Sequence, residues 1–250
     1  MSSSPEPTAS VTSSAMQTNK KKANSTTTRR HFIKRTIRQL AGIGLFFGTI
    51  SAFGRKALAQ AARIILPRGT KMSSLIDRNP ATLDTRNLAV MPLEDFETMG
   101  LTDHSVNPDQ WRLAVSGAVK KPLELTYDQV LNLPAIERNV LLICPGFFTN
   151  HGRWKGISIM ELLTQALAEP GITHVSIRGP EGRYAKVERF AIEEIASDKV
   201  FLAYRVNGKV LPGKHGYPLR VVAEDHYGSE WVKFVHQIEV HKINDPPEKS

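Results

Sequence analysis

The 250-residue chain holds a single cysteine, Cys144. One thiol excludes an internal disulfide framework and any metal site built from several cysteines. The sequence also lacks a Gly-x-Gly-x-x-Gly motif and a Walker motif, so a Rossmann or P-loop nucleotide site has no support. With 41% hydrophobic and 23% charged residues, the composition excludes a wholly disordered, a collagen-like or a polytopic membrane chain.

The body of the chain has no excess of positive charge, although the whole chain carries a formal charge of +9. Residues 1–59 contain ten Lys or Arg and one acid, Glu6, so the whole excess lies in this segment. The remaining residues contain 23 basic and 23 acidic side chains. A neutral body lacks the positive field that sequence-independent binding to nucleic acid needs, so we expect no nucleic-acid partner.

The N-terminal segment has the organisation of an export signal. Residues 2–28 are rich in Ser, Thr, Ala and Lys and cannot bury enough apolar surface to fold. Arg29-Arg30 precede the uncharged stretch Gln39–Gly54, whose 16 residues fall short of the about 20 that a spanning helix needs. Ala57-Leu58-Ala59 then forms a small-x-small cleavage pattern.

Residues 1–59 therefore predict a twin-arginine signal peptide. This assignment predicts a periplasmic protein that uses the twin-arginine translocation machinery. The alternative is an uncleaved N-terminal anchor that keeps the protein on the membrane, facing the periplasm.

Beyond the signal, the apolar pattern predicts an α+β protein. Residues 60–108 contain several prolines and no sustained apolar period, so we expect an irregular lead-in before a domain at residues 109–250. Strands dominate the predicted elements, and the helices are short, which favours α+β over a doubly wound sheet. Strands are expected at residues 112–119, 138–144, 174–178, 184–187, 200–206, 209–211, 219–223 and 232–240. A short helix or turn is expected at residues 127–133. Helices are expected at residues 158–168 and 192–196, the first of these opened by a capping box from Ser158 to Glu161.

Three segments carry residues that can do chemistry. Cys144 ends an apolar run just before Pro145-Gly146, where a thiol can face a cleft, although a lone cysteine in such a run is more often a core residue. The glycine-rich segment 207–220 ends with His215 and Arg220, which can both donate to a phosphate. Residues 228–233 add another glycine turn and a lysine. Each segment taken alone is also typical of an ordinary turn.

Together and in this order, these segments resemble the sulfite oxidase-like molybdopterin-binding oxidoreductase family, most closely its bacterial periplasmic members. The resemblance covers about residues 109–242. The matching pieces are Trp111-Arg112-Leu113-x-Val115-x-Gly117 with Pro122-Leu123, Leu142-Ile143-Cys144, Trp154-x-Gly156-Ile157 with Leu162-Leu163, Asn207-Gly208 with Leu211-Pro212, His215-Gly216-x-Pro218-Leu219-Arg220, and Gly228 with Val232-Lys233.

The resemblance implies a sulfite-oxidase-type molybdopterin-binding fold, with mixed β-sheets and short helices, and a molybdenum–molybdopterin cofactor with a single pterin. It implies that Cys144 is the catalytic thiolate that ligates molybdenum, a metal that a soft thiolate suits. It places a set of residues along the pterin and its phosphate, namely His215, Gly216, Arg220, Gly228 and Lys233. Asn150 and His151 follow Cys144 closely and are expected either to reach the cofactor or to shape a turn.

The implied enzyme is a molybdenum-dependent oxidoreductase that transfers an oxygen atom to or from a small substrate. The sequence shows no clear arginine cluster for a sulfite anion, which favours reduction of an S-oxide over a sulfite-type oxidase that passes electrons to a cytochrome. Because no second cofactor motif is present, the resemblance implies an external redox partner, either a membrane cytochrome b subunit or a soluble cytochrome c. The residues leave open a non-enzymatic periplasmic ligand-binding module, a Cys–His hydrolase and a zinc site among scattered histidines.

We predict that Arg29 and Arg30 direct export. Replacing both with lysine keeps the charge but removes the arginine pair that the pathway recognises, so precursor should accumulate in the cytoplasm. Cell fractionation and immunoblotting measure this. Normal export of the double variant would contradict the twin-arginine assignment, and a mature N-terminus far from Gln60 would move the cleavage site.

Overall fold

The computed structural model describes residues 63–182 and 185–243, which all belong to one compact unit of the chain. The predicted signal peptide at residues 1–59 lies outside the described residues, and its boundary stays a prediction. In the described part of the chain, no helix is both long and apolar enough to cross a membrane.

Two five-stranded sheets make up most of the unit. The first has the strand order β10-β9-β6-β5, and β11 also pairs with β9. Its strands are β5 (Ala135–Cys144), β6 (Phe148–Ser158), β9 (Val200–Val206), β10 (Lys209–Val210) and β11 (Arg220–Ala223). Within the described residues, neighbouring strands of this sheet run antiparallel.

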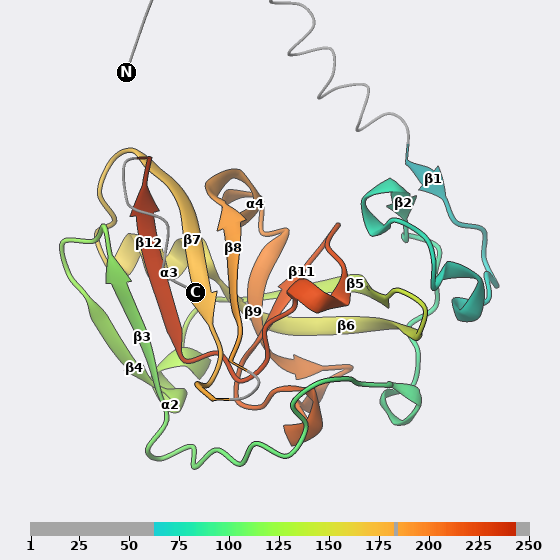
Figure 1. Ribbon diagram of the computed structural model, residues 1–250, viewed down its shortest axis with the longest axis horizontal. Helices are drawn as coiled ribbons and strands as arrows, with labels where there is room; N and C mark the ends of the chain where they lie inside the picture. The colour runs from blue at the N-terminus through green and yellow to red at the C-terminus, as the bar shows by residue number, and fades with distance from the viewer. Residues whose placement is uncertain (1–62, 183–184, 244–250) are drawn as a thin grey trace, which may run out of the picture. The chain divides into compact units, whose positions relative to one another are not determined.

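The second sheet has the order β4-β3-β12-β7-β8, with β3 and β12 parallel. In Figure 1 its long strands stand roughly upright, whereas β5 and β6 run across the view. Its strands are β3 (Arg112–Gly117), β4 (Leu123–Thr126), β7 (Ile172–Arg178), β8 (Val187–Ala191) and β12 (Gln237–Lys242).

The helices are short, and the segment before residue 109 has little regular structure. The α-helices are α2 (Tyr127–Leu131), α3 (Ile159–Gln165) and α4 (Ile192–Ala196). The 3-10 helices are η1 (Met72–Leu75), η2 (Pro80–Thr82), η3 (Leu93–Asp95), η4 (Gly213–His215) and η5 (Gly228–Glu230). In the lead-in, β1 (Ile64–Ile65) and β2 (Leu83–Asp84) form a small parallel pair. The domain boundary that we placed at residues 108/109 stays a prediction.

One large apolar core joins the two sheets. Val115 and Ile177 of the second sheet belong to the same buried cluster as Trp154 and Leu202 of the first, and all four side chains are fully buried. Leu162 of α3 is also fully buried in this cluster. Burial of this much apolar surface supplies the main favourable free energy of folding.

Strand β5 is buried on both faces. Its side chains alternate, so Val140 and Leu142 join the main core while Leu141 and Ile143 face the other way. That second face is covered by four leucines of the lead-in, namely Leu66, Leu75, Leu83 and Leu88. The continuous apolar run of this strand therefore reflects two separate hydrophobic contacts.

The predicted α+β class, with mixed sheets and short helices, is confirmed, and the helix at 192–196 and the strand at 200–206 have the predicted bounds. The Ser158 capping box was wrong. The Ser158 side chain makes no cap bond to α3, and its hydroxyl donates to Asp198 Oδ1 at 2.6 Å. The predicted end of this helix near residue 168 was also too late, because Leu167 adopts a positive φ of 52°.

Two strand predictions near the candidate site need correction. Strand β6, with 11 residues, was missed, because its polar and glycine-rich sequence lacks the alternation that marks a strand. The strand predicted at residues 232–240 is present only at Gln237–Lys242. Phe234 has a φ of 54°, which interrupts the extended backbone before β12.

Gly156 lies where the register between β6 and β9 shifts, and it permits a close backbone contact. A Cβ at this position would meet the Leu202 carbonyl oxygen at 1.8 Å, so we predict that Gly156→Ala lowers the free energy of unfolding by about 3 kcal/mol. Gly213→Ala is the control, because a Cβ there meets nothing within 4 Å. Urea unfolding measures both, and equal losses in the two variants would contradict this account.

Candidate active site

The alternation of side chains along β5 and β6, together with one tight turn, places Cys144 at a cavity. In the β5–β6 hairpin, Cys144 is opposite Phe148 and Leu142 is opposite Asn150, so all four side chains share one face. The Phe147 amide donates to the Cys144 carbonyl at 3.0 Å, which closes the turn directly after the cysteine. These four residues line a cavity of about 460 Å³, a volume typical of small-molecule sites.

The cavity gathers five of the residues that the sequence analysis selected. They come from separate segments of the chain and are Cys144, Asn150, Arg220, Gly228 and Lys233. Burial raises the pKa of the Cys144 thiol, so binding to a soft metal would release a proton from it.

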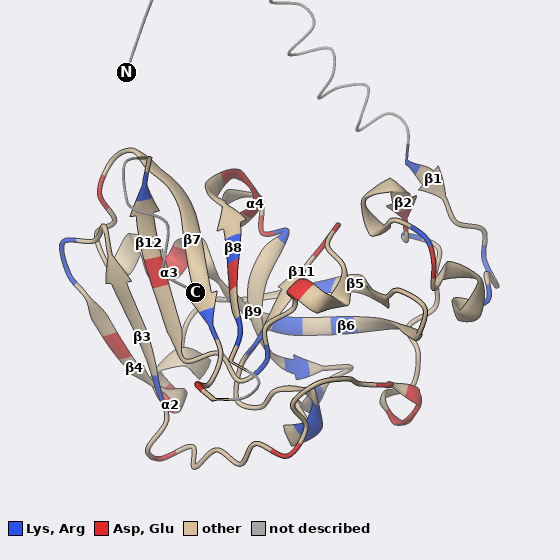
Figure 2. Ribbon diagram, viewed as in Figure 1, with Lys and Arg blue, Asp and Glu red and all other residues tan. Residues whose placement is uncertain are grey.

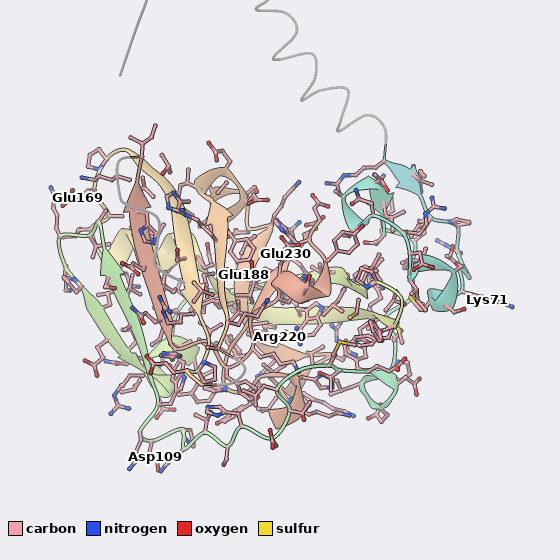
Figure 3. All side chains as sticks on the ribbon, viewed as in Figure 1. Lys71, Asp109, Glu169, Glu188, Arg220 and Glu230 are labelled. Carbon is pink, nitrogen blue, oxygen red and sulfur yellow. The ribbon has the colours of Figure 1, made fainter. Side chains whose placement is uncertain are left out.

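Arg220, which lies at the start of β11 and is labelled in Figure 3, is a buried cation. Its Nη1 donates to the His215 carbonyl at 3.1 Å, and its guanidinium lies 5.0 Å from the ring centre of Trp154 and 5.3 Å from that of Trp231. No carboxylate in the described part of the chain forms an ion pair with it. Burial lowers the pKa of Arg220 to about 9, so the side chain remains charged at neutral pH.

Lys233 adds a second positive charge to the same cavity. Its Nζ lies within hydrogen-bond distance of one hydroxyl and three backbone carbonyls. Burial, followed by the charge of Arg220, lowers the pKa of Lys233 to about 8. Among the described residues, neither the buried Arg220 nor the partly buried Lys233 pairs with a carboxylate, and a cavity with two such cations favours an anionic ligand.

His215 and Gly216 support these cations and do not line the cavity themselves. Burial, with smaller contributions from Arg220, Lys214 and Lys233, lowers the pKa of His215 to about 4, so its ring is neutral. Gly216 has a φ of 105°, and a Cβ there would meet the Lys233 Cβ at 2.9 Å. Gly216 thus allows the backbone to pass close to Lys233.

Asn150 and His151 lie within β6, so neither shapes a turn. Neighbouring residues of a strand face opposite sides, and only Asn150 lines the cavity. His151 faces the lead-in, where its Nδ1 lies 2.9 Å from the Ala89 carbonyl. The structure therefore does not bring His151 to the other candidate residues.

Two parts of the cavity wall were not foreseen from the sequence. Trp231, which was not among the candidate site residues, lines the cavity, and its Nε1 is buried with no hydrogen-bond partner among the described residues. Such a donor fits a ligand that offers an acceptor. Residues 97–101 of the lead-in also line the cavity, and no local sequence pattern marked them. The one sequence feature that could have indicated Trp231 as a wall residue is its position just after the Gly228 turn.

The loop that carries Gly228 is tied to α4 through His226. The ring nitrogens of His226 lie 2.9 Å from Glu230 and 2.7 Å from Glu194. Glu194 belongs to the acidic first turn of α4, seen in red in Figure 2. Burial alone would lower the pKa of His226, but the hydrogen bonds to the two carboxylates outweigh it and raise the pKa. This clamp fixes the loop that forms part of the cavity wall.

The described residues do not have the arrangement that a zinc site or a Cys–His hydrolase, both left open by the sequence, would need. No group of three or more His, Cys, Asp or Glu among them is arranged to hold a metal ion, as a zinc site would need. Across the same residues, no hydrogen bond joins Cys144 to a histidine, as a Cys–His hydrolase would need.

The fold and the cavity together define an α+β protein with a site for an anionic cofactor beside a single thiol. The chain matches the family described as the oxidoreductase molybdopterin binding domain over residues 100–247. It therefore belongs to this family, as the sequence analysis predicted. The predicted molybdenum–molybdopterin cofactor and the oxidoreductase class are confirmed by the same match.

Individual relatives agree with this assignment. The chain is 30% identical over 168 residues to the protein-methionine-sulfoxide reductase catalytic subunit MsrP of Gluconobacter oxydans, covering 61% of this chain and 53% of the relative. It is 28% identical over 162 residues to the NADH nitrate reductase of Volvox carteri, covering 53% of this chain and 19% of the relative. The chain thus spans about half of one relative and about a fifth of the other.

A solved structure has the same fold. The sulfane dehydrogenase SoxCD of Paracoccus pantotrophus matches with a TM-score of 0.52 and 24% identity, covering 55% of this chain and 40% of that chain. This match confirms the predicted sulfite-oxidase-type fold.

Proposed function

We propose that this protein is an exported molybdopterin-dependent oxidoreductase that transfers an oxygen atom to or from a small substrate. The observation that carries this proposal is that the single thiol of the chain and a buried, unneutralised arginine share one cavity. The proposal assigns Cys144 as the protein ligand of molybdenum and Arg220 as the anchor for the phosphate of the pterin.

The residues present fit such a cofactor. A soft metal needs a soft donor, which Cys144 supplies, and a phosphate suits the planar donor set of a guanidinium. The buried Trp231 Nε1, which has no partner among the described residues, offers a further donor. When bound, the molybdenum centre supplies two-electron oxygen-atom transfer.

In this proposal each protein group has a binding or positioning role. Arg220 donates to the phosphate, Lys233 adds positive charge, and the His215 carbonyl fixes the guanidinium. Gly228 lies close to the cavity, where a Cβ would meet Leu142 Cδ2 at 2.8 Å. Leu142 and Phe148 line the cavity beside Cys144 and would limit access of water to a metal bound there.

We favour an S-oxide as the oxidised substrate. Among the described residues that line the cavity, Arg220 is the one arginine. In this proposal it is taken up by the phosphate of the pterin. A sulfite-type oxidase would need a further available cation for its anion. The other cations on the cavity wall are Lys186, which pairs with Glu188, and Lys233, whose Nζ contacts four oxygen acceptors. The relative named as a methionine-sulfoxide reductase supports the same direction.

We further propose that the protein works in the periplasm and exchanges electrons with a separate redox partner. Arg29-Arg30 and the Ala57-Leu58-Ala59 pattern support export after the cofactor has been inserted. The resemblance to the family implies that this partner is a membrane cytochrome b subunit or a soluble cytochrome c.

The test of the proposed function is a metal and pterin analysis of the exported protein, combined with Cys144→Ser. Serine is a hard and weakly acidic donor, so the variant should lose turnover and change the Mo(V) paramagnetic resonance signal while keeping pterin. Reduced viologen with methionine sulfoxide, and ferricyanide with sulfite, measure the two directions. Full activity of Cys144→Ser with an unchanged signal would refute the ligand assignment.

We predict that Arg220→Ala lowers pterin occupancy, because a charge-assisted hydrogen bond contributes about 1.5–3 kcal/mol. Arg220→Lys should restore occupancy only in part, since it loses the bidentate geometry. Pterin content per protein, measured by fluorescence after oxidation, checks both. Full pterin content in the Arg220→Ala/Lys233→Ala double variant would contradict the phosphate assignment.

A further inference from the structure

One wall of the cavity is a segment of the lead-in, residues 97–101, which we call the strap. Asn150 of β6 holds the first strap residue through both ends of its side-chain amide. Its Nδ2 donates to the Glu97 carbonyl at 2.8 Å, and its Oδ1 accepts from the Glu97 amide at 3.1 Å. Asn150 is 2% exposed, so its side of these two bonds is buried, whereas Glu97 itself is exposed.

Lys233 holds the rest of the strap. Its ammonium lies 2.7 Å from Thr98 Oγ1, 2.9 Å from the Met99 carbonyl and 3.0 Å from the Leu101 carbonyl. A fourth acceptor, the Lys214 carbonyl, lies at 3.0 Å. An ammonium has three donors, so these groups account for all of the hydrogen bonds that Lys233 can make.

Little else fixes the strap. Within the described part of the chain, residues 97–101 make no backbone–backbone hydrogen bond, and Met99 is 46% exposed. The residue just before them, Phe96, is firmly anchored, because it is buried and its ring centre lies 5.9 Å from that of Trp154. A segment with a fixed end, few contacts and exposed backbone opens locally at low cost.

We propose that the strap closes the cofactor cavity and that Asn150 and Lys233 are the positioning residues that keep it closed. The inference rests on the proposed function, since it takes the cavity to be the cofactor site. Asn150 then acts through the strap and not as a direct ligand of the cofactor. Opening of the strap governs how fast the bound pterin is lost.

The test compares three variants of the pterin-loaded protein. Asn150→Leu removes both bonds to Glu97 at similar volume and should speed pterin loss about tenfold, which corresponds to about 1.4 kcal/mol. Thr98→Val removes one acceptor of Lys233 and the 3.3 Å hydrogen bond from the Thr98 hydroxyl to the Lys214 carbonyl, and it should speed pterin loss about threefold. The control is Thr149→Val on the opposite face of β6, where the hydroxyl donates to the Met72 carbonyl, and it should leave the rate unchanged.

A second readout does not need the cofactor. Cleavage after Glu97 by a glutamate-specific protease requires release of the Glu97 backbone, so Asn150→Leu should accelerate it and Thr149→Val should not. Urea unfolding of each variant separates strap opening from global unfolding. If Asn150→Leu fails to fold, the rates of pterin loss and of cleavage in Thr98→Val test the proposal.

Pterin loss and cleavage at wild-type rates in both strap variants would overturn the proposal, as would an equal acceleration in Thr149→Val. A wild-type protein without pterin would instead refute the proposed function. In that case the protease readout on the same chain still tests whether Asn150 holds the strap.

Discussion

The positive charge of Arg220 inside the protein is the constraint on which the arrangement of the site depends. Arg220 is 3% exposed, and its guanidinium lies near the rings of Trp154 and Trp231, which also contact each other. It has no carboxylate partner in the described part of the chain. A buried charge of this kind is costly unless an opposite charge compensates it. The nearby groups reflect the same field, because Arg220 contributes to the lowered pKa values of His215 and Lys233. An anion in the cavity would offset this cost, which is why the phosphate of a pterin suits it.

The position of the thiol follows from the pairing of β5 with β6. In this register Cys144 and Asn150 face the cavity, while His151 faces the lead-in. A shift of one residue would reverse these faces, so the apolar contacts on both sides of β5 fix the site as well as the fold. The four lead-in leucines that cover Leu141 and Ile143 therefore help to hold Cys144 in place.

The lead-in also contributes to the cavity itself. The family match begins at residue 100, yet Glu97, Thr98 and Met99 line the cavity before that point. The site thus combines a strand end, two glycine-rich loops and one segment held by side chains. Loops and strand ends commonly carry function on a rigid scaffold, and here the two sheets provide that scaffold.

The sequence by itself determined the chemistry that is available to this protein. It offers one thiol, and it places Arg220 and Lys233 beside glycine turns in the order that resembles the family. Local patterns also located the Asn207-Gly208 hairpin, where both residues have positive φ, and the helix of residues 192–196. These features depend on neighbouring residues, so spacing along the chain is enough to predict them. The tertiary structure alone decided that Asn150 and not His151 reaches the cavity, that the Ser158 hydroxyl bonds Asp198, and that residues 97–101 form a wall. Each of these depends on strand register or on a partner far away in sequence, and local residue patterns do not specify such contacts.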